Sequence, residues 1–169
     1  MFASSGGAIY GDAARLPATE RTAKRPASPY GITKKIVEDY FRWFHETYGL
    51  SYVLLAMANV YGPRQDPGLE GGVTAIFARA MIEGRRPIIF GDGRQTRDFV
   101  YVEDAVDAFQ RAADSRGGLL LNIASGRETR WAGSRGRPSR RACAARWSGT
   151  AAGRPAEPPA SGRETRSAA

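Results

Sequence analysis

Cysteine and long apolar runs are almost absent from this 169-residue chain. The single cysteine, Cys143, excludes an intrachain disulfide and argues against a cysteine-ligated metal cluster, so the sequence predicts a reducing, cytoplasmic setting. The chain has no run of about 18 apolar residues of the kind that predicts a membrane span. The first residues also lack the basic stretch and apolar stretch of a secretion signal. We therefore expect no membrane partner.

Large apolar side chains other than tryptophan are missing from residues 130–169, which contain no Leu, Ile, Val, Met, Phe or Tyr. Such a segment buries too little apolar surface to offset the entropy of ordering, so we expect a disordered tail. Residues 126–169 hold ten arginines and three glutamates, which accounts for seven of the eight net positive charges. These arginines have neither lysines nor regularly interleaved aromatic residues beside them. We therefore expect no specific nucleic-acid partner.

The rest of the chain is nearly neutral and alternates helical and extended patterns, which is typical of an α/β fold. Apolar residues at helical spacing predict helices over about 30–47, 73–83 and 103–113. Apolar runs predict strands over 1–5, 51–57, 87–90, 99–102 and 119–124. A loop is expected at 59–72. The apolar stripe of the first helix should be buried against a sheet, and its members are Ile32, Ile36, Val37, Tyr40, Phe41 and Phe44.

The start of the first helix carries the sequence Tyr30-Gly31-Ile32-Thr33-Lys34. Ser28 is the expected N-cap, and Pro29 suits the first helical position. A tyrosine and a lysine four residues apart share one face of a helix. The ammonium can then stabilise the phenolate, which makes the phenol a usable proton donor and acceptor.

Three more motifs surround this one in a fixed order. They are Ser4-Ser5-Gly6-Gly7-Ala8-Ile9-Tyr10-Gly11, Asn59-Val60-Tyr61-Gly62-Pro63-Arg64-Gln65 and Gly91-Asp92-Gly93-Arg94-Gln95-Thr96-Arg97-Asp98-Phe99. The series resembles the extended short-chain dehydrogenase/reductase family, in its NAD-dependent epimerase/dehydratase branch, and most closely the UDP-glucose 4-epimerase group. The resemblance covers about residues 1–129. It implies the C-terminal part of a Rossmann-like doubly wound sheet plus part of a small substrate-binding domain.

The resemblance also implies roles for the residues of the first two motifs. Tyr30 would be the acid and base at the sugar hydroxyl, and Lys34 would bind the nicotinamide ribose, so both would contact the cofactor NAD. Ser5 would hydrogen-bond the reacting oxygen, and Ser4 is the alternative for that hydroxyl. No metal is implied.

Three later residues match the family's substrate contacts. Asn59 and Arg97 match residues that contact the nucleotide-sugar diphosphate, and a guanidinium suits phosphate because it binds two oxygens at once. Phe90 matches the residue that lies against the nucleotide base. The alternatives are a turn residue for Asn59, a surface ion pair with Asp98 for Arg97, and a core position for Phe90.

The sequence departs from the family pattern in three ways. The family's dinucleotide-binding half, with its glycine-rich turn, would precede residue 1. The family's Arg-Tyr-x-Asn is Ala56-Met57-Ala58-Asn59 here, which weakens the expected hold on NAD. The resemblance ends after residue 129. We therefore expect a fragment that lacks activity on its own, in which strand 51–57 lacks neighbours and residues 130–169 come from a shifted reading frame.

The sequence thus predicts a fragment of an NAD-dependent nucleotide-sugar 4-epimerase that binds a UDP-sugar and pairs with a second copy through the helix at 30–47. One alternative is an inactive remnant that acts through its basic tail. Another is a nucleotide-sugar 4,6-dehydratase or decarboxylase of the same superfamily. Those enzymes carry an acid just after the active-site hydroxyl, where this chain has Gly6 and Gly7.

Overall fold

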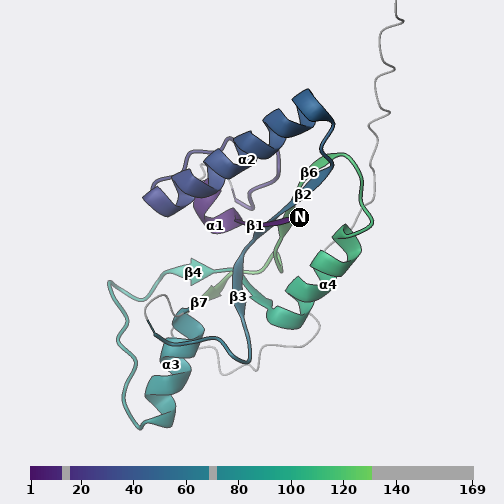
Figure 1. The fold of residues 1–169 in the computed structure, drawn as a ribbon. Helices are drawn as coiled ribbons and strands as arrows, with labels where there is room; N and C mark the ends of the chain where they lie inside the picture. The colour runs from purple at the N-terminus through teal and green to yellow at the C-terminus, as the bar shows by residue number, and fades with distance from the viewer. Residues whose placement is uncertain (13–15, 69–71, 131–169) are drawn as a thin grey trace, which may run out of the picture.

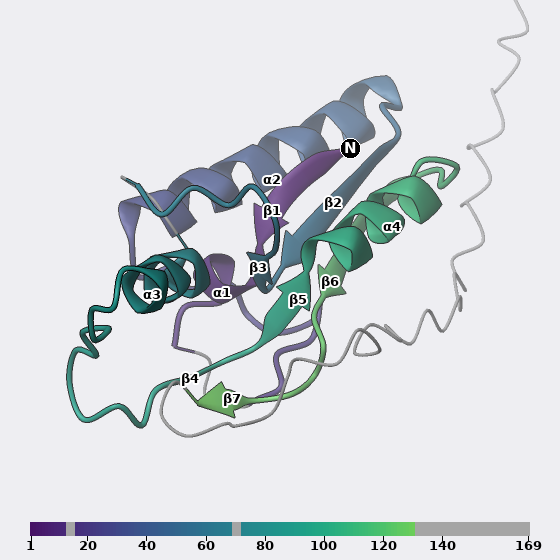
Figure 2. The same cartoon turned by 90° about the horizontal axis from the view of Figure 1, so that it is seen from below.

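The computed structural model describes residues 1–12, 16–68 and 72–130. These residues form a parallel sheet covered by one long helix on each face, with a second lobe of short strands and one helix beyond one end of the sheet (Figures 1 and 2). The predicted α/β organisation is therefore confirmed. Cys143 and nearly all of the expected disordered, frame-shifted tail lie outside the described residues.

The central sheet has the order β1 (Phe2–Ser5), β2 (Tyr52–Met57), β6 (Gly118–Ile123), and all pairs are parallel. Leu55 of β2 pairs with Ala3 of β1 on one side and with Leu121 of β6 on the other. The expectation that strand 51–57 lacks neighbours is therefore wrong, because β6 returns to the sheet after the second lobe. Coverage of both faces explains the nearly continuous apolar sequence of β2.

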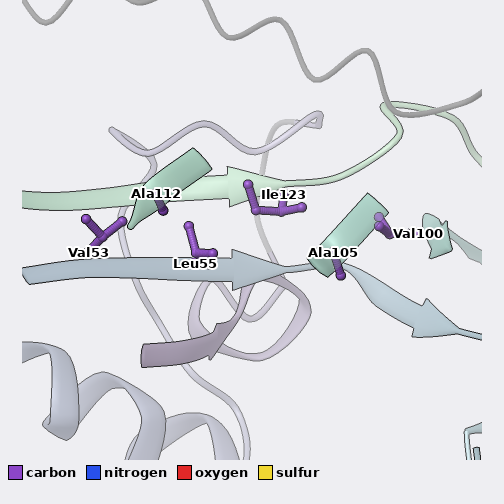
Figure 3. Packing of buried hydrophobic residues seen from close by; sticks show 6 residues of the cluster. All are labelled: Val53, Leu55, Val100, Ala105, Ala112 and Ile123. Carbon is purple, nitrogen blue, oxygen red and sulfur yellow. The ribbon is translucent and has the colours of Figure 1, made fainter. Parts of the chain in front are cut away.

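Each face of the sheet packs against its own helices because side chains alternate along β2. Val53 and Leu55 point toward α4 (Val102–Ala112), where they form the main core with four other buried residues (Figure 3). Those four are Val100, Ala105, Ala112 and Ile123. Ala56 points the other way, against α1 (Gly6–Ile9) and the buried Ile9.

The second lobe is built from two short ribbons and a helix. β3 (Asn59–Tyr61) and β5 (Phe99–Tyr101) pair in parallel, and β4 (Thr96–Arg97) and β7 (Thr129–Arg130) pair antiparallel. The helix is α3 (Val73–Ile82). Two predictions were wrong here: the loop expected at 59–72 begins with β3, and residues 87–90 form no strand. Ile88 and Phe90 are 72% and 80% exposed, so the apolar run at 87–90 packs against little. Arg130, expected to begin the tail, ends β7.

The other predicted helices and strands begin and end within one residue of the expected bounds. The helix at 30–47 is α2 (Pro29–Tyr48), in which Ser28 Oγ accepts a hydrogen bond from the Gly31 amide at 3.1 Å. Gly49 closes the helix in the left-handed conformation, at φ 70°. In the described part of the chain, no helix is long and apolar enough to cross a membrane.

The apolar stripe of α2 is buried less than predicted. Phe41 packs on Phe2 and Tyr52, with ring centroids 5.8 and 5.5 Å apart. The face that meets β1 and β2 therefore runs through Phe41, and the apolar ridge beside it stays outside the contact. That ridge is exposed at Ile32, Ile36, Tyr40, Trp43, Phe44 and Tyr48. We call these six residues the α2 ridge.

Candidate active site

Tyr30 and Lys34 lie one turn apart at the start of α2, as predicted. The Lys34 Nζ atom is 5.5 Å from the centroid of the Tyr30 ring and 4.7 Å from that of Phe2. It donates a hydrogen bond of 2.9 Å to the main-chain carbonyl of Ala3 in β1. The lysine therefore ties α2 to β1 next to the tyrosine. Because Tyr30 is 57% exposed, its phenol is open to a substrate.

Gly31 sets how closely this part of α2 approaches α1. A Cβ atom built on Gly31 would lie 2.5 Å from the carbonyl oxygen of Ala8 and 3.0 Å from the Pro26 side chain. No side chain fits in that space without movement of the backbone. The glycine between Tyr30 and Lys34 therefore allows the helix start to rest on α1, directly after the two serines.

The two candidate serines occupy different environments at the carboxyl end of β1. Ser4 is 4% exposed, and its hydroxyl is buried with no hydrogen-bond partner among the described residues. Ser5 is partly exposed at the N-cap of α1, and its hydroxyl makes no capping hydrogen bond. Ser5 is thus the more accessible hydroxyl, and its catalytic role remains a prediction.

Asn59 and Arg97 are held close together by the ribbons of the second lobe. Asn59 pairs with Phe99, which places Arg97 only two residues before its partner. Both the main-chain amide and the side-chain Nδ2 of Asn59 donate to the carbonyl of Asp98, at 3.0 and 3.1 Å. Asn59 is therefore a strand residue, and its interpretation as a turn residue is wrong.

Arg97 is exposed on β4 and its Nη1 donates to the carbonyl of Thr96 at 2.8 Å. The interpretation of Arg97 as an ion-pair partner of Asp98 is wrong, because the Asp98 carboxylate binds Ser125 and Gly126 instead. The exposed guanidinium, whose hydrogen bond among the described residues goes to a neighbouring carbonyl, can still receive an anion.

Phe90 lies on the connection from α3 to β4, just before the Gly91-Asp92-Gly93 turn. Its side chain is 80% exposed, so the core interpretation is wrong. Its carbonyl accepts a hydrogen bond from the Gln95 side chain at 3.3 Å, which closes the turn. The ring is therefore free to meet a base, and that role remains a prediction.

A partly buried polar pair that the sequence did not reveal supports the α1 side of the site. The hydroxyl of Tyr10, which is 4% exposed, donates to Asn122 Oδ1 at 2.8 Å, and Asn122 Nδ2 donates to the Ala18 carbonyl at 3.2 Å. Burial raises the pKa of Tyr10 to about 12. Tyr10 belongs to a motif that sequence analysis singled out, but its partner lies 112 residues away.

Two further features bear on the chemistry. Among the described residues, no group of three or more His, Cys, Asp or Glu side chains could hold a metal ion. An open, largely apolar hollow of about 590 Å³ lies between α3 and the β3–β5 ribbon. None of the predicted site residues lines it, and its walls include Tyr61, Gln65, Ala78 and Tyr101.

Comparison with known proteins identifies the family to which this sequence and fold are similar. The model of the NAD dependent epimerase/dehydratase family matches residues 1–124. The UDP-glucose 4-epimerase of Mycolicibacterium smegmatis is 47% identical over 130 residues, which cover 76% of this chain and 42% of that protein.

Two solved structures share the fold. The Thermotoga maritima UDP-glucose 4-epimerase with UDP-glucose is 48% identical, with a TM-score of 0.74 over 76% of this chain and 42% of that one. The Thermus thermophilus UDP-glucose 4-epimerase complex with NAD is 40% identical, with a TM-score of 0.69 over 76% and 43%. These matches confirm the Rossmann-like α/β prediction. The chain spans less than half the length of these relatives.

Proposed function

Because this chain belongs to the NAD-dependent epimerase/dehydratase family, we propose that it carries the tyrosine–lysine centre and the nucleotide-sugar contacts of a UDP-glucose/UDP-galactose-type 4-epimerase. The observation that carries this proposal is the position of Lys34, which is bonded to β1 and lies 5.5 Å from the exposed Tyr30 ring. The catalytic unit comprises residues 1–129. The predicted cytoplasmic setting stays a prediction from the sequence.

The residues around Lys34 fit the ribose end of NAD. An ammonium group has three N–H donors, and Lys34 uses one of them on the Ala3 carbonyl. Two donors remain for a pair of hydroxyls, which is what a ribose offers. NAD, when bound, supplies the hydride acceptor and donor for the sugar carbon.

The side chains of this chain would move and stabilise the proton. Tyr30 takes the proton of the sugar C4 hydroxyl as the C4–H bond breaks, and it returns the proton when hydride comes back to the other face. The ammonium of Lys34 favours the phenolate form, which Tyr30 must have before it takes the proton and regains when it returns it. The Ser5 hydroxyl donates a hydrogen bond to the reacting oxygen, while Asn59, Arg97 and Phe90 hold the nucleotide.

Binding of UDP-glucose to the purified chain tests the proposal. We expect Arg97→Ala to weaken the affinity about 10- to 100-fold, because a hydrogen bond to a charged group contributes about 1.5–3 kcal/mol. The affinity can be measured by titration calorimetry. Arg111→Ala is the matched control, because Arg111 is also an exposed arginine but pairs with Asp107 on α4.

The outcomes separate the proposal from its rivals. A failure of the wild-type chain to bind UDP-glucose at millimolar concentration contradicts it, and an equal loss with Arg111→Ala contradicts the assignment of Arg97. NAD binding is measured in a parallel titration. If neither ligand binds, the inactive-remnant alternative is favoured.

We also propose that a second copy of the chain covers the α2 ridge. The rings of Trp43, Phe44 and Tyr48 contact one another there, two pairs edge to face and one tilted, with centroid distances of 4.9 to 5.8 Å. These residues are nevertheless 50%, 41% and 69% exposed. A contiguous apolar patch of this kind marks an interaction surface. The long, regular α2 can pair with its own copy across a two-fold axis.

Sedimentation velocity checks this pairing. We expect the wild-type chain to sediment as a dimer at micromolar concentration, and the double variant Ile36→Ser with Tyr40→Ser to sediment as a monomer. Val106→Ser is the control, since Val106 is a 51% exposed apolar residue on α4, away from the ridge. A wild-type monomer at all concentrations contradicts the pairing.

A further inference from the structure

Asp98 is the junction of the two ribbons that present Asn59 and Arg97. The residue before it pairs with Thr129 of β7, and the residue after it pairs with Asn59 of β3. Its main-chain carbonyl accepts both hydrogen bonds of Asn59. One residue therefore sets the relative positions of the two side chains proposed to meet the diphosphate.

The carboxylate of Asp98 is occupied by the turn that follows β6. Its Oδ1 accepts from the Ser125 amide at 2.8 Å and from the Ser125 hydroxyl at 2.7 Å, and its Oδ2 accepts from the Gly126 amide at 2.7 Å. The Ser125 hydroxyl in turn accepts from the Arg127 amide at 3.2 Å. This turn leads from β6 into β7, so the carboxylate fixes the strand that lies beside Arg97.

The same three donors occupy the Asp98 carboxylate, which forms no ion pair with Arg97 among the described residues. A carboxylate next to an arginine can pair with it and compete with an anionic ligand. Here the turn at Ser125 and Gly126 satisfies the carboxylate, and within the described part of the chain Arg97 bonds a main-chain carbonyl. One of the two N–H groups of the Asn59 amide is used on Asp98, so the other is available for a phosphate oxygen.

We propose that Asp98 is a positioning residue for the diphosphate of the nucleotide-sugar, acting through Asn59 and Arg97. This inference rests on the proposed function. Asp98 does not touch the ligand itself. It holds the carboxamide and the guanidinium in one frame, while its own carboxylate is bonded to the turn at Ser125 and Gly126.

Titration of the purified chain with UDP and, separately, with uridine tests the inference. We expect Asp98→Asn to weaken UDP binding about tenfold, because the amide nitrogen cannot accept the bonds of the turn. Uridine, which has no phosphates, should bind as it does to the wild type. Removal of a negative charge beside Arg97 would by itself strengthen anion binding. A loss of UDP affinity therefore reports lost geometry.

Two further variants keep the result interpretable. Asp107→Asn removes the same charge from the exposed pair on α4 and should leave both affinities unchanged. Ser125→Ala removes only the hydroxyl of the turn, and should weaken UDP binding by a smaller factor without affecting uridine. If Asp98→Asn does not fold, the UDP and uridine affinities of Ser125→Ala test the positioning role in its place.

Three results overturn the inference. UDP binding by Asp98→Asn that equals or exceeds that of the wild type removes the positioning role but leaves the proposed function intact, provided Arg97→Ala still loses UDP. An equal loss of UDP and uridine affinity shows a general structural role. A wild-type chain that does not bind UDP overturns this inference and the proposed function together.

Discussion

Replacement of Gly11 by alanine is expected to lower the free energy of unfolding by about 2–5 kcal/mol. Gly11 has φ 59°, and a left-handed conformation costs a residue with a Cβ atom about 1–2 kcal/mol. The new Cβ would also lie 1.9 Å from the Arg25 carbonyl oxygen, so the backbone must move. Overpacking of this kind costs about 1–3 kcal/mol. Urea unfolding followed by circular dichroism measures the change.

Three other glycines separate the two causes. Gly49 also has a positive φ of 70° but open space around it, so Gly49→Ala should cost about 1–2 kcal/mol. Gly31 meets the Ala8 carbonyl at 2.5 Å without a positive φ, so Gly31→Ala should cost about 1–3 kcal/mol. Gly7→Ala meets nothing within 4 Å in α1 and should be neutral or slightly stabilising. A Gly11→Ala cost no greater than that of Gly49→Ala contradicts the proposed clash.

The sequence predicted the elements whose patterns are local. The helix at 30–47 follows from its cap at Ser28, its periodic apolar residues and the stop at Gly49, and the structure begins and ends it within one residue of those bounds. Residues 87–90 look like a strand by composition, but a strand also needs a partner, which no local pattern supplies. β3 was missed because it has only three residues and is followed at once by Gly62-Pro63, which is typical of a turn. Its strand conformation comes from pairing with β5, which lies far away in the sequence.

The contacts of the site also fall into local ones, which the sequence predicts, and long-range ones, which it does not. The spacing of Tyr30 and Lys34 places them on one helix turn, so their proximity could be predicted. The bond from Lys34 to the Ala3 carbonyl and the clamp of Asp98 on Ser125 join residues 31 and 27 positions apart. Such contacts depend on the topology of the sheets. The amphipathic pattern of α2 likewise identified apolar residues but not which of them the sheet covers, and four of the six predicted are exposed.

Tyr10 should make the chain unusually sensitive to alkaline pH. Burial raises its pKa from 10.0 to about 12 in the folded chain, whereas the phenol of the unfolded chain titrates near its ordinary value. The unfolded state therefore loses the proton first. The stabilising contribution is fully present below pH 10 and is lost as pH rises through 12, which removes up to about 2–3 kcal/mol from the free energy of unfolding.

Tyr10→Phe isolates this effect in urea unfolding between pH 8 and 12. Below pH 10 the variant should be less stable by about 1 kcal/mol, because Asn122 Oδ1 loses its donor. Above pH 10 the difference should shrink and then reverse, because a phenylalanine has no proton to lose. Other groups that titrate in this range, including Tyr52 and Tyr61, whose pKa values burial also raises, are common to both proteins and cancel in the difference. Parallel stability curves from pH 8 to 12 would show that ionisation of Tyr10 does not limit the stability of the fold at high pH.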